Sequence, residues 1–395
     1  MTSLPSLEVK GRTVFLRVDF NVPVDDGGNV RDDTRIKASL PTLNYLLDHG
    51  ARVVVCSHLG RPKGKPDPKF SLKPVAERLS KLLSRPVKFA GAVVGPEVDS
   101  LKSGLKDGEV LMLENVRFQP GETANDEAFA GQLAQGVDLY VNDAFGSCHR
   151  AHASVEAIAH KVKTCAAGFL LEKEVEYLGR AVRSPQKPYT AILGGAKVSD
   201  KIPVIDNLIN KADDILIGGA MAYTFFKAQG REVGRSLVEE DKKEMALAIL
   251  RKAQDKKINF LLPLDHVLAT AANATGAEKT VEAFPLPPHL MAVDIGPKTV
   301  AAFSQVIARA KTIFWNGPLG VFEVPAFSQG TTAIARAIAQ SQAMSIVGGG
   351  DSLAALAQTG LSERITHVST GGGASLEFLA YETLPGLEAL GWKKP

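Results

Sequence analysis

Short runs of Val, Ile and Leu alternate with longer segments of helical period along the first half of the chain. The runs TVFLRV, ARVVVCS, VLMLENV and LYVNDAF have the character of strands, and the intervening segment LPTLNYLLDHG has the spacing of an amphipathic helix that ends at Gly50. Strands without a polar face are typical of a parallel sheet that helices cover on both sides. The first half therefore predicts an α/β domain with a mostly parallel, Rossmann-like sheet.

The second half repeats this plan. Its strand-like runs end in glycine or a polar residue and lead into helical patterns: TAILGG, DILIGG, NFLLPLD, TIFWNG, MSIVGGG and THVSTGGG. The fold class predicted for the whole chain is thus α/β, with two lobes that each hold such a sheet flanked by helices. A length of 395 residues suits two domains of similar size.

One amphipathic segment, FLLEKEVEYLGRAVRSPQKPY, separates the two halves. Its apolar stripe and its two closing prolines predict a helix that stops before the second lobe: Leu171, Val175, Leu178, Val182, Pro185 and Pro188. Such a connector is either a plain link or a hinge. We expect a substrate domain at 1–170, the connector at 171–188, a nucleotide domain at 189–379 and a C-terminal segment at 380–395 that returns to the first lobe.

Composition excludes several classes of protein. A net charge of +3 is too small for a nucleic-acid or membrane surface, although it allows a local basic patch that binds a small anion. The three cysteines form no close pair, which predicts neither disulfides nor a zinc site and indicates a reducing compartment. With no leader-like N-terminus and no apolar run of 18 residues, the expected location is the cytoplasm.

Charged side chains follow the predicted strands of the first half, at the edge where ligands bind in open α/β sheets. They come from separate segments: Arg17, Asp19, Asn21, Arg35, His58, Arg61, Arg117, His149, Arg150 and His152. Guanidinium groups hold phosphate and carboxylate oxygens in pairs, so the cluster predicts a site for a small, multiply charged anion. For the histidines we favour hydrogen bonding or packing over a nucleophile, a base or a metal pair.

Glycines occupy the corresponding positions of the second half. They lie in GGAKVSDK (194–201), IGGAMAYTF (217–225), NGPLGVFE (316–323), GGGDS (348–352) and TGGGASLEF (370–378), where a strand leads into a helix start suited to phosphate. Neither GxxxxGK[ST] nor a GxGxxG on the first βα turn is present, which disfavours a P-loop enzyme and a nicotinamide dehydrogenase. Lys197 and Lys201 would share a face of such a helix, and Asp351 could bind Mg²⁺.

The motifs together resemble the phosphoglycerate kinase family over nearly the whole chain. In the family's order they are RVDFNVP, DDTRI, SHLGRP, ENVRF, NDAFGSCHRAHAS, GGAKVSDK, WNGPLGVFE, GGGDS and TGGGASLEF. The resemblance implies reversible phosphoryl transfer from 1,3-bisphosphoglycerate to ADP, giving 3-phosphoglycerate and MgATP. It also implies direct in-line transfer after hinge closure, which favours the hinge interpretation of the connector.

The resemblance assigns roles to individual residues. Phosphoglycerate would contact Asp19, Phe20, Asn21, Arg35, His58, Leu59, Gly60, Arg61, Arg117 and Arg150. The nucleotide would contact Lys201, Gly218, Gly219, Glu323, Gly349, Gly350, Asp351 and Ser352, with the glycines at 218 and 219 leaving room for adenine, Glu323 on the ribose and Asp351 on Mg²⁺. Arg35, Lys197 and the amides of Gly371, Gly372 and Gly373 would stabilise the transferring group. Arg17 is expected to pair with Asp19 or another acid.

The expected partners are phosphoglycerate and ATP or ADP with Mg²⁺ as cofactor, with no nucleic acid and no membrane, and we expect a monomer. The alternative is a catalytically silent nucleotide-binding protein of the same fold. The chain departs from the family near its end, where FLAYETLPG replaces a pattern close to FLEGKELPG. If the replaced glycine has a positive φ, Tyr381 needs a different local path. Cys148 and His266 are departures without a functional explanation.

Overall fold

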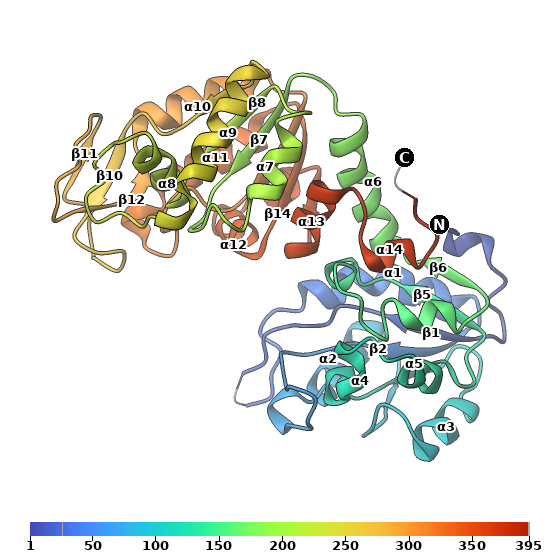
Figure 1. Ribbon diagram of the computed structural model, residues 1–395. Coiled ribbons are helices and arrows are strands. Elements are labelled where there is room, and N and C mark those ends of the chain that lie inside the picture. Colours follow the sequence, from blue (N-terminus) through green and yellow to red (C-terminus); the bar gives the residue numbers. More distant parts are fainter. Residues whose placement is uncertain (26, 394–395) are drawn as a thin grey trace. The chain divides into compact units, whose positions relative to one another are not determined.

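The computed structural model describes residues 1–25 and 27–393. Two compact units make up the chain: unit 1 comprises Met1–Glu176 and the stretch from Thr383 onward, and unit 2 comprises Tyr177–Glu382. A six-stranded sheet forms the centre of each unit (Figure 1). None of the helices that the structure describes combines the length and the apolar character needed to span a bilayer.

The sheet of unit 1 is parallel throughout, with the strand order β3-β4-β2-β1-β5-β6. Its strands are β1 (Thr13–Arg17), β2 (Arg52–Cys56), β3 (Val87–Phe89), β4 (Val110–Met112), β5 (Leu139–Asn142) and β6 (Cys165–Ala167). The α-helices among them are α1 (Thr34–Asp48), α2 (Lys73–Leu83), α3 (Pro96–Ser103), α4 (Pro120–Thr123) and α5 (Glu127–Ala134). The sequence predicted β1, β2, β4 and β5 but not the short β3 and β6.

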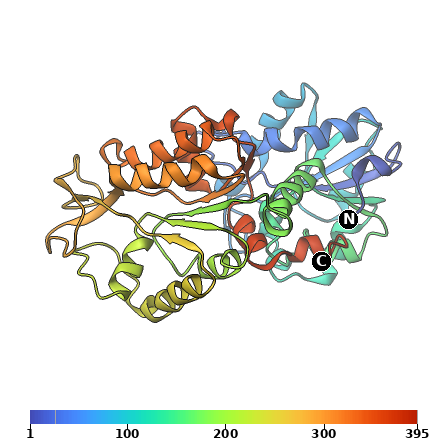
Figure 2. The ribbon, with the colours of Figure 1, turned by 90° about the horizontal axis from the view of Figure 1, so that it is seen from above.

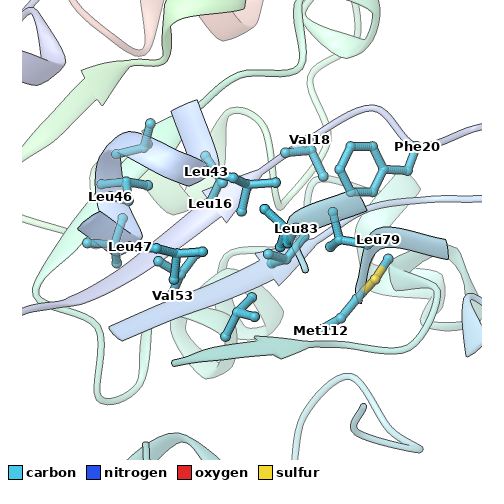
Figure 3. Packing of buried hydrophobic residues seen from close by; sticks show 14 of the residues in the cluster. Leu16, Val18, Phe20, Leu43, Leu46, Leu47, Val53, Leu79, Leu83 and Met112 are labelled. Atoms are coloured by element: carbon cyan, nitrogen blue, oxygen red, sulfur yellow. The ribbon is translucent and has the colours of Figure 1, made fainter. Parts of the chain in front are cut away.

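A buried apolar layer holds α1 and α2 against this sheet. Figure 3 shows Leu43, Leu46 and Leu47 of α1 with Leu79 and Leu83 of α2, packed with Leu16, Val53 and Met112 from the strands. Each such side chain contributes about 1.5–3 kcal/mol when fully buried. The register pairs Arg17 with both Cys56 and Asn142, so β1, β2 and β5 end at one level and their following loops share an edge.

Unit 2 has a second parallel sheet, with the order β15-β14-β13-β7-β8-β9. Its strands are β7 (Tyr189–Leu193), β8 (Asp214–Ile217), β9 (Asn259–Leu261), β13 (Thr312–Asn316), β14 (Met344–Gly348) and β15 (His367–Ser369). The helices are α7 (Ile202–Leu208), α8 (Met221–Ala228), α9 (Lys243–Asp255), α10 (Pro297–Arg309), α11 (Gln329–Gln340), α12 (Gly350–Gln358) and α13 (Gly373–Tyr381). All six strands of this sheet coincide with predicted runs.

Unit 2 also contains a small antiparallel sheet that the sequence did not predict. It consists of β10 (His266–Ala269), β11 (Lys279–Val281) and β12 (Met291–Ile295), in the order β11-β10-β12. The yellow and orange ribbons of these strands lie at the end of unit 2 in Figure 1, and Figure 2 shows them from above. This sheet supplies one wall of the cavity described below.

The connecting helix α6 (Phe169–Arg183) contains the boundary between the two units, which falls after Glu176. Its N-terminus is capped by side chains of unit 1. Asp143 Oδ1 accepts the N–H groups of Leu170 at 2.9 Å and Leu171 at 3.2 Å, and Thr42 Oγ1 accepts that of Phe169 at 2.9 Å. Since a carboxylate satisfies N–H groups that a helix leaves free, Asp143 fixes where this helix begins.

The chain leaves unit 2 at the end of α13. Tyr381 is the last residue of that helix, and the positive φ falls on the next residue, Glu382, at +63°. The conflict foreseen for Tyr381 therefore does not arise. Glu382 Oε1 pairs with Lys211 Nζ at 2.5 Å. Beyond it, α14 (Pro385–Glu388) belongs to unit 1, where the Gly386 N–H donates to the Cys148 carbonyl at 2.9 Å.

Candidate active site

An ion pair of Asp19 and Arg35 stands at the carboxyl edge of the sheet in unit 1. Arg35, in the first turn of α1, donates from Nη1 to Asp19 Oδ2 at 2.7 Å, and its side chain is one-third exposed. Burial opposes the charge of Asp19, but His58, Arg35 and Arg17 outweigh it and lower the pKa of that carboxyl. An ionised Asp19 therefore orients the guanidinium group of Arg35 while leaving part of it open.

Arg17, which opens the motif RVDFNVP, is fully buried. It donates to the Val18 carbonyl and, from Nε, to Ser154 Oγ at 2.7 Å; Ser154 in turn donates to Glu122 Oε1 at 2.7 Å. The direct ion pair expected with Asp19 or another acid is wrong for the part of the chain that the structure describes. Ser154 stands between Arg17 and Glu122, so the charge is compensated through a hydroxyl group.

His58 is held between Arg17 and Asp19. Its Nδ1 lies 3.2 Å from Arg17 Nη2, which can only donate, so Nδ1 accepts and Nε2 carries the proton. Nε2 lies 4.0 Å from Asp19 Oδ1. Burial lowers the pKa of His58 well below its ordinary value, and the nearby arginines oppose protonation further. The arrangement suits a neutral hydrogen-bond donor better than a base or a nucleophile.

Three of the predicted arginines line one cavity of about 310 Å³: Arg61, Arg117 and Arg150. Lys63 and His152 contribute to the same lining. Arg117 donates from Nη1 to the Gly60 carbonyl at 2.8 Å; burial, then Arg17 and Arg150, lower its pKa to about 10. Arg117 remains charged at neutral pH; Glu122 and Asp19 favour its charge, but the like charges of Arg17 and Arg150 oppose it, so the cavity suits an anion.

Other residues predicted for this site lie beside that cavity in different environments. Asn21, Leu59 and Gly60 line a neighbouring hollow of about 510 Å³, and the Gly60 N–H donates to Asn21 Oδ1 at 2.9 Å. The Phe20 side chain is fully buried in the core of unit 1, and its N–H donates to Ser57 Oγ at 2.8 Å. A side-chain contact between Phe20 and substrate is therefore excluded in this structure, because its ring packs beneath the edge.

In unit 2, glycines allow three loops to pack backbone against backbone. Gly194 donates to the Asn316 carbonyl at 2.9 Å, Gly195 to that of Pro318 at 2.8 Å and Gly219 to that of Leu319 at 3.0 Å. A Cβ on Gly218 would lie 2.5 Å from Leu319 Cδ2, and one on Gly219 would lie 2.6 Å from the Gly195 nitrogen. A side chain on either glycine would meet protein atoms, so the packing of the loops requires both; that they leave room for adenine stays a prediction.

A mostly apolar cavity of about 250 Å³ opens beside these loops. Among the residues predicted for the nucleotide site, Gly219, Glu323 and Asp351 line this cavity, but Gly218 does not. Sequence reasoning missed the part of the wall that comes from β12 and neighbouring loops: Leu237, Pro263, Ala272, Met291, Ala292, Val293, Asp294 and Ile295. The alternation of the MAVDI run was the available signal for β12, but the antiparallel pairing that places it was not visible.

The two lysines of GGAKVSDK do not share a helical face. Residues 197–201 are not helical: a turn lies at 199–201, and α7 begins only at Ile202, because Pro203 favours the first turn of a helix. Lys197 is exposed, whereas Lys201 is buried beside Gly195, with Nζ 3.7 Å from the position of a Cβ there. Burial lowers the pKa of Lys201, against the opposing charges of Asp200 and Asp351.

Two helix N-termini follow the adjacent strands β14 and β15. Gly349, with φ +97°, precedes α12, and Gly372, with φ +55°, precedes α13. A Cβ on Gly350, Gly372 or Gly373 would meet no atom within 4 Å, in contrast to the packed loops. Gly371 donates to Ser369 Oγ at 3.2 Å, and the buried Ser352 uses its Oγ to accept the Gly317 N–H at 2.6 Å. Open amides at a helix start suit phosphate oxygens.

A family model described as phosphoglycerate kinase matches residues 4–382. The chain belongs to the phosphoglycerate kinase family. Phosphoglycerate kinases of Koribacter versatilis and Solibacter usitatus are 55% and 57% identical to it, each over 98% of both chains. The phosphoglycerate kinase structure from Coxiella burnetii matches with a TM-score of 0.88 at 41% identity, covering 99% of this chain and 98% of that one, and the Pyrococcus horikoshii enzyme matches with 0.88 at 35%.

Membership in the phosphoglycerate kinase family makes the chain a phosphotransferase with a carboxyl group as acceptor. It confirms the family predicted from the ordered motifs and the two-lobed α/β class. The relatives give no support to the alternative of a silent nucleotide-binding protein.

Proposed function

We propose that the protein transfers a phosphoryl group reversibly from 1,3-bisphosphoglycerate to ADP, giving 3-phosphoglycerate and ATP. The observation that carries this proposal is the family match over residues 4–382, since it includes both the cationic edge of unit 1 and the glycine-rich edge of unit 2. The geometry of each edge supports a separate role, anion binding in unit 1 and nucleotide binding in unit 2.

Phosphoglycerate binds at the cationic edge of unit 1 in this proposal. Arg61, Arg117 and Arg150 hold its phosphate group, because they line one cavity and their guanidinium groups can bind phosphate oxygens in pairs. Asn21, Arg35 and His58, oriented by Asp19, hold the carboxyl end. Phe20, Leu59 and Gly60 contribute backbone groups, since the side chains of the first two are buried.

The nucleotide binds at the edge of unit 2. Its base occupies the apolar cavity, its ribose contacts Glu323, and its phosphates contact Lys201 and the backbone of Gly349, Gly350, Asp351 and Ser352. Asp351 also suits Mg²⁺, because it lies in the first turn of α12 and, among the described residues, no ion pair occupies its carboxylate. Mg²⁺ prefers one or two carboxylates with phosphate oxygens and, when bound, neutralises phosphate charge.

Arg35, the exposed Lys197 and the amides of Gly371, Gly372 and Gly373 stabilise the transferring group. In-line transfer needs positioning and charge neutralisation more than a base, which agrees with the neutral His58. We also retain as a proposal that domains 1–170 and 189–379 close about the connector 171–188, which would exclude water from the acyl phosphate. The segment 380–395 completes the first of these, and we expect a monomer.

The reaction can be tested with the wild-type chain, MgATP and 3-phosphoglycerate. A dehydrogenase that consumes the acyl phosphate reports its formation, and we expect NADH oxidation only when both substrates are present. ATP consumption without 3-phosphoglycerate, or binding of MgATP with no transfer at all, would contradict the proposal and restore the silent binder as the better account.

A further inference from the structure

The carboxylate of Glu239 holds the turn between Lys197 and α7, although Glu239 has no part in the proposed function. Glu239 Oε1 accepts the hydroxyl of Ser199 at 2.5 Å, and Glu239 Oε2 accepts the Ser199 N–H at 3.0 Å. Ser199 lies midway between the two lysines, in a segment with no helical hydrogen bonds of its own before Lys201. Because the two carboxylate oxygens of Glu239 accept the amide and the hydroxyl of the same residue, they fix both the position and the orientation of the turn.

Glu239 is itself fixed from the other side. Its N–H donates to Thr224 Oγ1 of α8 at 3.1 Å, and Thr224 is buried. Burial raises the pKa of Glu239, but the hydrogen bonds from Ser199 outweigh it and leave the pKa below its ordinary value, so the carboxylate is charged near neutral pH. The turn is thus tied to α8, the helix that also supplies Tyr223 to the apolar cavity.

The segment that ends in Glu239 begins at the cavity wall. Ser236 Oγ accepts the Ala292 N–H of β12 at 3.0 Å, and the half-exposed Leu237 lines the cavity. Residues 236–239 therefore connect the wall proposed for the base with the turn proposed for the phosphates. Glu239 does not line the cavity itself, but through Ser199 it acts on the positions of Lys197 and Lys201.

We infer that Glu239 is a positioning residue that holds the lysine turn of unit 2 in place for the phosphates of the nucleotide. The inference rests on the proposed function. Without the carboxylate, Ser199 loses its acceptor, the turn becomes mobile, and Lys197 and Lys201 reach a phosphate only in a fraction of the molecules. Binding of the base and ribose should be unaffected, because the cavity wall does not depend on those hydrogen bonds.

The test uses Glu239→Gln, with Glu240→Gln as a matched control whose carboxylate pairs with Lys243 on the surface at 2.7 Å. For Glu239→Gln we expect kcat/KM for ADP to fall by roughly tenfold, the scale of one charge-assisted hydrogen bond. Adenosine, which has no phosphate, should bind both variants and the wild type with the same Kd by calorimetry. Ser199→Ala, which keeps the amide donor, should fall between the wild type and Glu239→Gln.

Two results would overturn the inference. Equal kcat/KM for ADP in Glu239→Gln and Glu240→Gln would show that the hydrogen bonds between Ser199 and Glu239 do not affect catalysis. An equal loss of ADP and adenosine affinity in Glu239→Gln would show a merely structural role. If Glu239→Gln does not fold, Ser199→Ala decides by the same two readouts. A wild type without turnover would reject the proposed function instead, and ADP against adenosine affinity would still test the positioning role.

Discussion

The two edges that we assign to the two substrates differ in the chemical groups that they present. At the edge of unit 1, long cationic side chains from several segments surround a cavity, with Arg61, Arg117 and Arg150 as its charged lining. At the edge of unit 2, backbone dominates: glycine loops pack closely together, and two helix starts carry glycines that face open space. A small trianionic ligand needs charge from all sides, whereas a nucleotide needs a flat apolar slot and a phosphate cradle.

This difference predicts different kinds of sensitivity. Side chains in unit 1 can be removed without disturbing the backbone, so their loss should appear in activity. Glycines in unit 2 fall into two groups, those whose missing side chain is replaced by protein and those that face open space. Substitution in the first group should appear in stability, and substitution in the second group should appear in nucleotide binding.

The largest effect is expected from Arg35→Ala. Loss of the cation that we propose to face the transferring group should lower kcat on the order of 10²-fold or more, while the fold persists because the side chain of Arg35, in the first turn of α1, is one-third exposed. Steady-state assays and thermal unfolding would measure both. The control is Arg12→Ala, which removes an exposed arginine at the opposite end of β1. Near-normal turnover in Arg35→Ala would remove this residue from the mechanism.

A glycine pair sharpens the comparison within unit 2. Gly219→Ala introduces a Cβ at φ +66° and 2.6 Å from the Gly195 nitrogen, so it should destabilise the fold by about 1–3 kcal/mol. Gly350→Ala, at a glycine that we place on the nucleotide, meets no atom within 4 Å and should leave stability unchanged while raising KM for ADP about tenfold.

Thermal unfolding and ADP titration of both variants would check this contrast. Normal ADP kinetics in Gly350→Ala would mean that the open space at the start of α12 does not serve the nucleotide. An unfolding temperature of Gly219→Ala equal to that of the wild type would contradict the packing of the loops.

A pH-dependent effect on stability is expected from Asp143, the cap of α6. Burial raises the pKa of this carboxyl to about 7, although the N–H groups of Leu171 and Leu170 oppose the shift. In the unfolded chain it titrates near 3.9, so between about pH 4 and pH 7 the folded state binds the extra proton and stability falls as pH rises. This residue changes the free energy of unfolding by at most about 1.4 kcal/mol per pH unit.

Asp143→Asn should remove this residue's contribution to the fall of stability with pH, while it keeps an oxygen that accepts the N–H groups of Leu170 and Leu171. Denaturant unfolding of the wild type and the variant at pH 5 and pH 8 measures the difference. Asp294, whose pKa burial also raises to about 7, provides a background slope that is common to both proteins. An identical pH dependence in the two chains would contradict the raised pKa of Asp143.

Strands that are apolar on both faces were predictable, because their burial leaves a continuous hydrophobic run. β3 was missed because it has only three residues, of which Lys88 is exposed and the other two are only partly buried. The antiparallel sheet was missed because its strands are short and contain polar residues, so none of them forms a continuous apolar run. The ordered motifs were sufficient for the family. What each residue does locally was less predictable: the burial of Phe20 and Arg17, the turn before α7 and the hydrogen bonds of Glu239 all depend on contacts over long sequence separations.

The most direct test of the account is to measure turnover and ADP affinity together in the wild type and in Lys197→Ala. The account predicts rapid wild-type turnover with MgATP and 3-phosphoglycerate, lost on the order of 10²-fold in the variant, while ADP affinity changes little because Lys197 acts on the transferring group. Absence of wild-type turnover with MgATP still bound, or full turnover in Lys197→Ala, would contradict it.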